Sequence, residues 1–106
     1  MIKVTIERNE YNRISGFIIE DHAQSEVCSA VSSLAINAAN SIEAFADEKS
    51  SCELREDGYI SFSMPEVRKG KLNRDANLLM ESLLLGLKSI RLEYPSQIRI
   101  REKRLQ

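Results

Sequence analysis

Residues 14–46 of the chain read ISGFIIEDHAQSEVCSAVSSLAINAANSIEAFA, and the hydrophobic pattern changes period within this stretch. Ile14 to Glu20 has the apolar content and the length of a short β-strand. From Ser25 onwards the apolar residues recur at helical spacing, which gives one apolar face over about five turns. That face comprises Val27, Ala30, Val31, Leu34, Ala35, Ala38, Ile42, Phe45 and Ala46. The stretch therefore predicts a strand followed closely by a helix packed on a core.

The start and the outer face of this predicted helix are both polar. Ser25 is well placed to cap the helix, because its hydroxyl can accept a hydrogen bond from a backbone N–H of the first turn. The outer face is small and almost uncharged, and we expect another backbone to pass close to it. Its residues are Ser29, Ser32, Ser33, Asn37 and Asn40.

The flanking segments predict two hairpins. Residues 2–7 alternate between apolar and polar side chains, as in a half-buried strand, and a turn-like segment separates them from the strand at 14–20. Further along, residues 52–55 and 59–64 lie on either side of Asp57-Gly58, which is a strong hairpin-turn signal. Pro65 ends the later strand.

A second helix is predicted after a basic loop, capped by Asn73 or Asp75 and running to about Glu93. Its core stripe comprises Ala76, Leu79, Met80, Leu83, Leu84, Leu87 and Ile90. Leu78, Leu85 and Leu92 form another stripe on an adjoining face, at seven-residue spacing. This second stripe indicates either a wide buried face or a homodimer contact, and we favour the dimer.

A last strand over residues 98–101 completes the order β-β-α-β-β-α-β. Such a set of elements predicts an α+β fold, a mostly antiparallel sheet with two helices packed on one face. At 106 residues the chain is long enough to close one core, so we expect a single domain over residues 1–106.

Composition narrows the function classes. The chain has no apolar run that could span a bilayer, and it opens on an alternating Met1-Ile2-Lys3-Val4 segment instead of a signal sequence, so we expect a cytoplasmic protein. Two cysteines are too few for a disulfide scaffold, and their neighbours predict no metal site. We expect no cofactor.

The net charge of −1 argues against non-specific binding to nucleic acid, and we expect no direct specific binding either. Cations nevertheless cluster in two places, which predicts either solvated charge or a patch that meets RNA or another anionic partner. These cations are Arg68, Lys69, Lys71 and Arg74, and then Arg99, Arg101, Lys103 and Arg104.

His22 and Cys28 are the residues best placed for chemistry. His22, the only histidine, follows the second strand, and Cys28 lies six positions later in the first turn of the predicted helix. Backbone N–H groups at a helix N-terminus stabilise a thiolate, and they can also serve a tetrahedral oxyanion. A nearby imidazole can accept the thiol proton. Cys52 has no such neighbours and reads as a structural residue.

The sequence resembles the ribosomal-processing cysteine protease family, Prp, over essentially its whole length. The resemblance includes the opening strand, the His22-Ala23 step and Val27-Cys28-Ser29-Ala30-Val31-Ser32 at the start of the helix. The hairpin, the leucine-rich helix and Tyr94-Pro95-Ser96-Gln97-Ile98-Arg99 follow the family as well.

The resemblance implies a homodimeric cysteine endopeptidase that removes the N-terminal extension of a large-subunit ribosomal protein. By position, Cys28 matches the nucleophile and His22 the general base. Ser32 matches a serine that faces the same pocket one helical turn later, and we expect Ala23 and Ser29 to contact substrate as well.

Two departures from the family pattern bear on substrate binding. Asp21 stands where the family usually has Gly, and it either raises the basicity of His22 or is simply solvated; we favour the solvated reading. Only residues 23–27 separate His22 from Cys28, whereas the family usually has a longer, glycine-containing loop. An alternative function is therefore a non-catalytic, ribosome-associated binding module, and a plain nucleic-acid binder ranks last.

Overall fold

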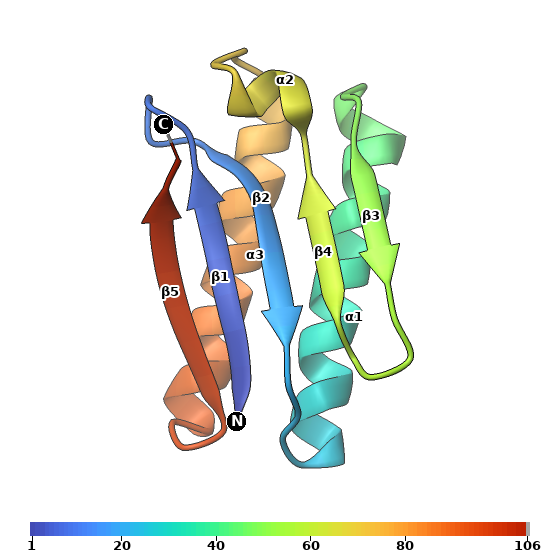
Figure 1. Cartoon of the computed structure of the whole chain (residues 1–106), viewed down its shortest axis with the longest axis vertical. Coiled ribbons are helices and arrows are strands. Elements are labelled where there is room, and N and C mark those ends of the chain that lie inside the picture. The colour runs from blue at the N-terminus through green and yellow to red at the C-terminus, as the bar shows by residue number, and fades with distance from the viewer. Residues whose placement is uncertain (106) are drawn as a thin grey trace.

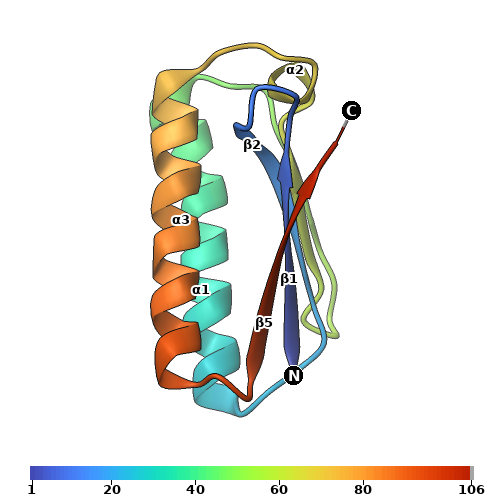
Figure 2. The same cartoon turned by 90° about the vertical axis from the view of Figure 1, so that its left-hand side faces the viewer.

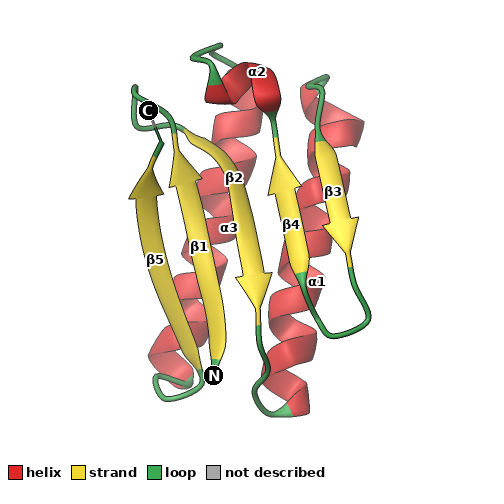
Figure 3. Ribbon diagram, in the orientation of Figure 1, coloured by secondary structure: helices red, strands yellow, loops and turns green. Residues whose placement is uncertain are grey.

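The computed structural model describes residues 1–105 as one five-stranded sheet with two long helices against one of its faces (Figures 1 and 2). Figure 3 distinguishes these layers by secondary structure. The α+β class, the mostly antiparallel sheet and the two helices on one face are confirmed. The elements, in chain order, are β1 (Ile2–Arg8), β2 (Ile14–Glu20), α1 (Ser25–Ser41), the π-helical turn η1 (Ile42–Ala46), β3 (Ser51–Leu54), β4 (Ile60–Ser63), α2 (Pro65–Arg68), α3 (Arg74–Glu93) and β5 (Ile98–Arg104).

The strands lie in the order β3-β4-β2-β1-β5, so β3 and β5 are the two edges of the sheet. All neighbours are antiparallel except β1 and β5, which run parallel because the chain crosses over through α3. The helices cover one face, and the other face is open in Figure 1, where the helices lie behind the sheet.

The core lies between the sheet and the helices. Alternate residues of β1 point into it, and Ile2, Val4 and Ile6 are almost completely buried. Phe17 of β2 and Phe62 of β4 stack at the centre with ring centroids 5.3 Å apart. Of the described residues, no helix is both long and apolar enough to cross a membrane.

The first helix differs from the sequence prediction at both ends. Gln24 occupies the N-cap position without a side-chain hydrogen bond, and Ser25 is already the first helical residue, so the predicted cap is wrong. The α-helix ends at Ser41 and the chain continues through η1. A π-helical turn holds more residues than an α-turn, so it rotates the following side chains out of register. Phe45 is therefore 73% exposed, contrary to its predicted burial.

Most of the predicted apolar face of α1 is buried, including Val27, Val31 and Ala38. Ala30 is exposed, whereas Ala39 is buried beside Ala35. The helix thus turns its Ala35–Ala39 side towards α3 and the sheet.

The second long helix is confirmed, with Asn73 as its cap. The Oδ1 atom of Asn73 accepts a hydrogen bond from the N–H of Ala76 at 3.0 Å, while its Nδ2 donates to the buried carboxylate of Glu48 at 2.9 Å. The predicted basic loop before it contains the short helix α2. Three of the loop's cations are paired: Arg68 with Glu7 at 2.8 Å, Lys69 with Glu66 at 3.7 Å and Lys71 with Glu48 at 3.0 Å.

The second leucine stripe of α3 lies outside the core. Leu78, Leu85 and Leu92 are 70%, 68% and 85% exposed. The wide buried face considered from the sequence is therefore wrong for this chain, and an apolar row faces solvent along α3.

Candidate active site

His22 and Cys28 lie at one end of the sheet, where several connections meet. β2 ends at Glu20, Asp21 turns the chain with a left-handed φ of 68°, and α1 begins at Ser25. The chain's first residue, the turn between β3 and β4 and the start of β5 lie at this same end, the lower one in Figure 1. His22 and Cys28 both line a pocket of about 30 Å³ there, together with Ser32 and Gly58.

The thiol of Cys28 is half-buried and is held by the backbone of Ala23. The N–H of Ala23 donates to the Cys28 Sγ at 3.3 Å, and the Sγ donates to the Ala23 carbonyl at 3.5 Å. The short loop between His22 and Cys28 therefore folds back over the sulfur. An N–H aimed at sulfur also stabilises a thiolate, since it donates to the charged form.

Two of the backbone N–H groups at the start of α1 are occupied in this conformation. The N–H groups of Val27 and Cys28 both donate to the carbonyl of Gln24, at 3.0 Å each. The first turn of α1 is thus closed by its own backbone, and these N–H groups become available to a substrate oxygen only when residue 24 moves.

The imidazole of His22 is exposed and lies against the backbone of Gly58. A Cβ atom added at Gly58 would be 3.0 Å from the His22 Cε1 atom and 3.4 Å from its Nδ1. The carbonyl of His22 accepts a hydrogen bond from the nitrogen of Met1 at 2.7 Å. Within residues 1–105 no hydrogen bond joins the His22 ring to the Cys28 Sγ, so these two groups share a pocket without direct pairing.

Asp21 pairs with Lys3 instead of His22. Its carboxylate lies 3.4 Å from the Lys3 ammonium, and both side chains are more than half exposed. This agrees with the expectation of a solvated carboxylate. Among the described residues, no group of three or more His, Cys, Asp and Glu side chains is arranged to hold a metal ion.

Comparison with known proteins identifies the family. The profile of cysteine protease Prp matches residues 1–99. The chain belongs to this family. It is 29% identical over 107 residues to the ribosomal processing cysteine protease Prp of Bacillus subtilis, with 94% of this chain and 96% of that protein covered.

Solved structures show the same fold. The Prp protease of Staphylococcus aureus, in complex with a covalently linked product peptide, superposes with a TM-score of 0.86 at 25% identity, over 97% of this chain and all of that one. SMU.848 from Streptococcus mutans superposes with a TM-score of 0.83 at 22% identity, over 99% of this chain and 96% of that one. The Bacillus subtilis relative of this Prp-family chain is a ribosomal processing cysteine protease, and the Staphylococcus aureus one is a ribosomal processing protease.

The predicted substrate-contacting residues occupy different places in this Prp-family chain. Ser32 lines the pocket of Cys28 from one helical turn further along α1. Ala23 contributes its backbone to the thiol. Ser29 is exposed and does not line that pocket; it faces an open groove along the polar side of α1.

The groove along α1 consists of two adjoining hollows, and the first of them shares a residue with the Cys28 pocket. One, of about 540 Å³, is lined by the small polar residues of α1 and includes Ser32, which also lines the Cys28 pocket. The other, of about 240 Å³, shares Ile36 and Asn40 with the first and reaches Leu54 on the edge strand β3. No backbone of the described chain covers this polar face, contrary to the expectation from its composition.

Sequence reasoning missed the residue that anchors the loop over the thiol. The side-chain oxygen of Gln97 accepts a hydrogen bond from the N–H of Gln24 at 2.9 Å. The backbone carbonyl of Gln97 accepts one from the N–H of Ile2 at 2.8 Å. The two loops are 73 positions apart in the sequence, so no local pattern could reveal the contact. Only the resemblance at residues 94–99 pointed to this segment.

Cys52 is exposed on β3 and not buried as a structural residue would be. Partial desolvation raises the pKa of its thiol above the ordinary value. Cys52 lines the far hollow of the groove, away from His22.

Proposed function

We propose that this chain is a cysteine endopeptidase that removes the N-terminal extension of a large-subunit ribosomal protein in the cytoplasm. The observation that carries the proposal is the common pocket of His22, Cys28 and Ser32 in a chain of the Prp family. Cys28 is the nucleophile, His22 is the general base, and Ser32 contacts substrate beside the nucleophile.

The reaction uses two side chains of this pocket, Cys28 and His22, together with one water molecule. The His22 imidazole accepts the Cys28 thiol proton, and the thiolate attacks the scissile carbonyl carbon to form a tetrahedral oxyanion. When this collapses, the imidazolium gives its proton to the leaving amine and a thioester remains. His22 then takes a proton from water, the hydroxide adds to the thioester, and the acid product leaves as the Cys28 thiol is restored.

The loop over residues 23–25 must move before substrate can react. It caps the sulfur through Ala23, and the Gln24 carbonyl occupies the N–H groups of Val27 and Cys28. Displacing it frees the sulfur and supplies donors for the oxyanion in one step. The short loop thus closes the resting site.

The groove along α1 is the proposed path of the bound peptide. It continues from Ser32 past Ser33 to Ile36 and ends beside Leu54, so an extended chain leaving the Cys28 pocket would pass polar side chains before reaching apolar ones. Ile36 and Leu54 are 38% and 58% exposed, which suits them to contact an apolar substrate residue.

Cleavage of the natural substrate tests the proposal. The full-length ribosomal protein with its extension is incubated with wild type, Cys28→Ala and the control Ser51→Ala, and the products are sized by mass spectrometry. Ser51 is an exposed residue of β3 that lines neither the Cys28 pocket nor the groove. We expect Cys28→Ala to lose all cleavage and Ser51→Ala to retain it. Equal cleavage by wild type and Cys28→Ala would overturn the assignment.

A second candidate function is a non-catalytic, ribosome-associated binding module. It is favoured by the engaged thiol, which bonds to Ala23 and lacks a bond to His22. This function predicts that wild type binds the unprocessed ribosomal protein without cleaving it, and that Cys28→Ala binds equally well.

We also propose that the chain forms a homodimer through the exposed leucine row of α3. Leu78, Leu85 and Leu92 recur every second turn and lie about 10.5 Å apart along the axis. A row of this kind is self-complementary across a two-fold axis, so a second copy can bury it.

A further inference from the structure

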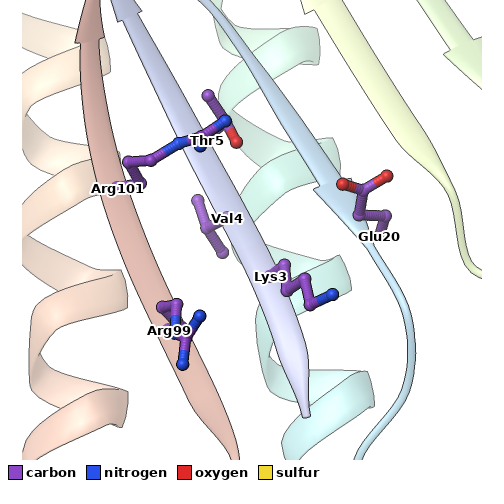
Figure 4. A pocket seen from close by; sticks show the side chains of 6 residues that line it. All are labelled: Lys3, Val4, Thr5, Glu20, Arg99 and Arg101. Atoms are coloured by element: carbon purple, nitrogen blue, oxygen red, sulfur yellow. The ribbon is translucent and has the colours of Figure 1, made fainter.

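The open face of the sheet presents a row of cations along β1 and β5. Side chains on one face of a strand recur every second residue, so Arg99, Arg101 and Lys103 of β5 share the face that Lys3 of β1 occupies. Lys3, Arg99 and Arg101 surround a hollow of about 300 Å³ on this face, with Thr5 at its floor (Figure 4).

The cations of the β5 row form no ion pair within the described residues, although Glu7 of β1, itself paired with Arg68, lies opposite Lys103 in the register. Within residues 1–105, Arg99, Arg101 and Lys103 have no carboxylate within 4.0 Å. Glu102 lies between the last two along the chain, but it pairs with Arg8 and Lys88 on the helix side of the sheet. The hollow contains one acidic side chain, from Glu20 on β2.

Acidic residues gather at the opposite edge of the molecule. The hairpin of β3 and β4 includes Glu53, Glu56 and Asp57, with one cation, Arg55, paired to Glu53, and β3 is the edge strand farthest from β5 in the sheet. The net charge of −1 is a sum over the whole chain, and it does not describe the β5 side.

We propose that this open face, defined by Lys3, Arg99, Arg101 and Lys103, binds the phosphate backbone of RNA. The inference rests on the proposed function, because a protease of ribosomal proteins works where RNA is the dominant polyanion. Guanidinium groups pair with phosphate oxygens through two hydrogen bonds at once. None of the residues lining the hollow is aromatic, so it offers no aromatic ring for base stacking.

Such binding is weak, independent of base sequence and sensitive to salt. If all four cations contact phosphates of single-stranded RNA, the slope of log K against log salt concentration is about −2.8, because each phosphate contact contributes about −0.7. Lys3 already pairs with Asp21, so a slope closer to about −2 is expected from the three free cations.

The test measures binding of a short fluorescent single-stranded RNA by anisotropy, at several salt concentrations. We expect Arg99→Glu/Arg101→Glu to weaken binding about tenfold or more and to flatten the salt slope. The matched control is Lys49→Glu/Arg74→Glu, two exposed cations away from this face whose reversal changes the net charge equally. The control should retain most of the affinity. Equal loss in both variants, or no RNA binding by wild type, would overturn the proposal.

Two further arms separate the possible ligands and the two proposals. Competition with polyglutamate tests whether the partner of this face is an acidic protein instead of RNA. Displacement of RNA by polyglutamate at equal charge concentration would contradict RNA as the partner. Cleavage of an isolated substrate peptide by Arg99→Glu/Arg101→Glu should equal that of wild type. If wild type binds RNA but cleaves nothing, the proposed protease function fails while the RNA face stands.

Discussion

At the scale of single residues, Gly58 leaves the room that the His22 imidazole occupies. Gly58 has a φ of 84°, which an L-residue adopts at a cost of roughly 1–2 kcal/mol, and an added methyl group would lie 3.0 Å from the ring. We expect Gly58→Ala to displace His22 and to lower kcat/KM for peptide cleavage by about tenfold or more. Steady-state kinetics with a fluorogenic substrate peptide measures this loss.

Gly70→Ala is the matched control for this experiment. Gly70 also has a positive φ, of 113°, and an added methyl group would meet the ring of Tyr11 at the same 3.0 Å, at the other end of the sheet. Both variants should lose similar stability, but only Gly58→Ala should lose activity. Equal kinetic losses would assign the effect to stability and remove Gly58 from the positioning of His22.

The two thiols differ in their surroundings, and alkylation can separate them. Partial desolvation raises the pKa of Cys52, so at any pH below that value a smaller fraction is thiolate than for an ordinary thiol. In a Cys28→Ala background, iodoacetamide should therefore label Cys52 slowly at neutral pH, with a rate that rises only at alkaline pH. A rate profile equal to that of free cysteine would contradict this.

In the Cys52→Ala background the same reagent reports on Cys28. If His22 acts as its base, His22→Ala should slow the labelling of Cys28 at neutral pH while the far-ultraviolet spectrum stays unchanged. Unaltered labelling would favour the binding-module alternative.

At the scale of elements, Asn73 joins α3 to the segment after α1. It caps α3 through Ala76, and its amide supplies a hydrogen bond to Glu48, whose side chain is fully buried. Asn73→Ala removes the cap and one donor to a buried carboxylate, so we expect the free energy of unfolding to fall by about 2–4 kcal/mol. Urea denaturation measures this.

Asn73→Ser separates the two contributions. Serine keeps a cap oxygen but cannot reach Glu48 as the amide does. The free energy of unfolding should therefore fall by about 1 kcal/mol less in Asn73→Ser than in Asn73→Ala. Identical losses in the two variants would show that the cap contributes nothing.

The elements themselves were largely predictable because their signals are local. Alternation along β1, the Asp57-Gly58 turn and the cap at Asn73 each depend on residues close in sequence. The end of α1 was not predictable, because nothing in residues 42–46 distinguishes a π-turn from continued α-helix. Phe45 was consequently predicted to be buried, whereas it is exposed. The position of Ser25 was wrong by one residue, since Gln24 caps without using its side chain.

At the scale of the whole molecule, the candidate site is assembled from four distant segments. His22 touches Gly58 and Met1, while Gln97 holds Gln24. Local patterns placed His22 and Cys28 near a helix start, but the contacts that fix their surroundings depend on the order of strands in the sheet. That order brings the start of β5 beside β1 and the β3–β4 turn beside β2.

The exposed leucine row of α3 belongs to this same scale, because its role depends on a second copy of the chain. Leu85 lies at the centre of the row, and burying its side chain contributes about 1.5–3 kcal/mol per copy, whereas a buried glutamate carboxylate would oppose association. We expect Leu85→Glu to be monomeric at concentrations where wild type is dimeric, as measured by sedimentation velocity.

Leu72→Glu provides the control for the dimer experiment. Leu72 is 49% exposed and precedes α3, outside the row of Leu78, Leu85 and Leu92, so the same charge introduced there should leave the dimer intact. A monomeric wild type, or a dimer that persists in Leu85→Glu, would exclude this helix face as the interface. Because the row and the Cys28 pocket involve different residues, monomeric Leu85→Glu should still cleave an isolated peptide unless the partner copy completes the groove. A loss of cleavage on dissociation would therefore place part of the substrate site across the two-fold axis.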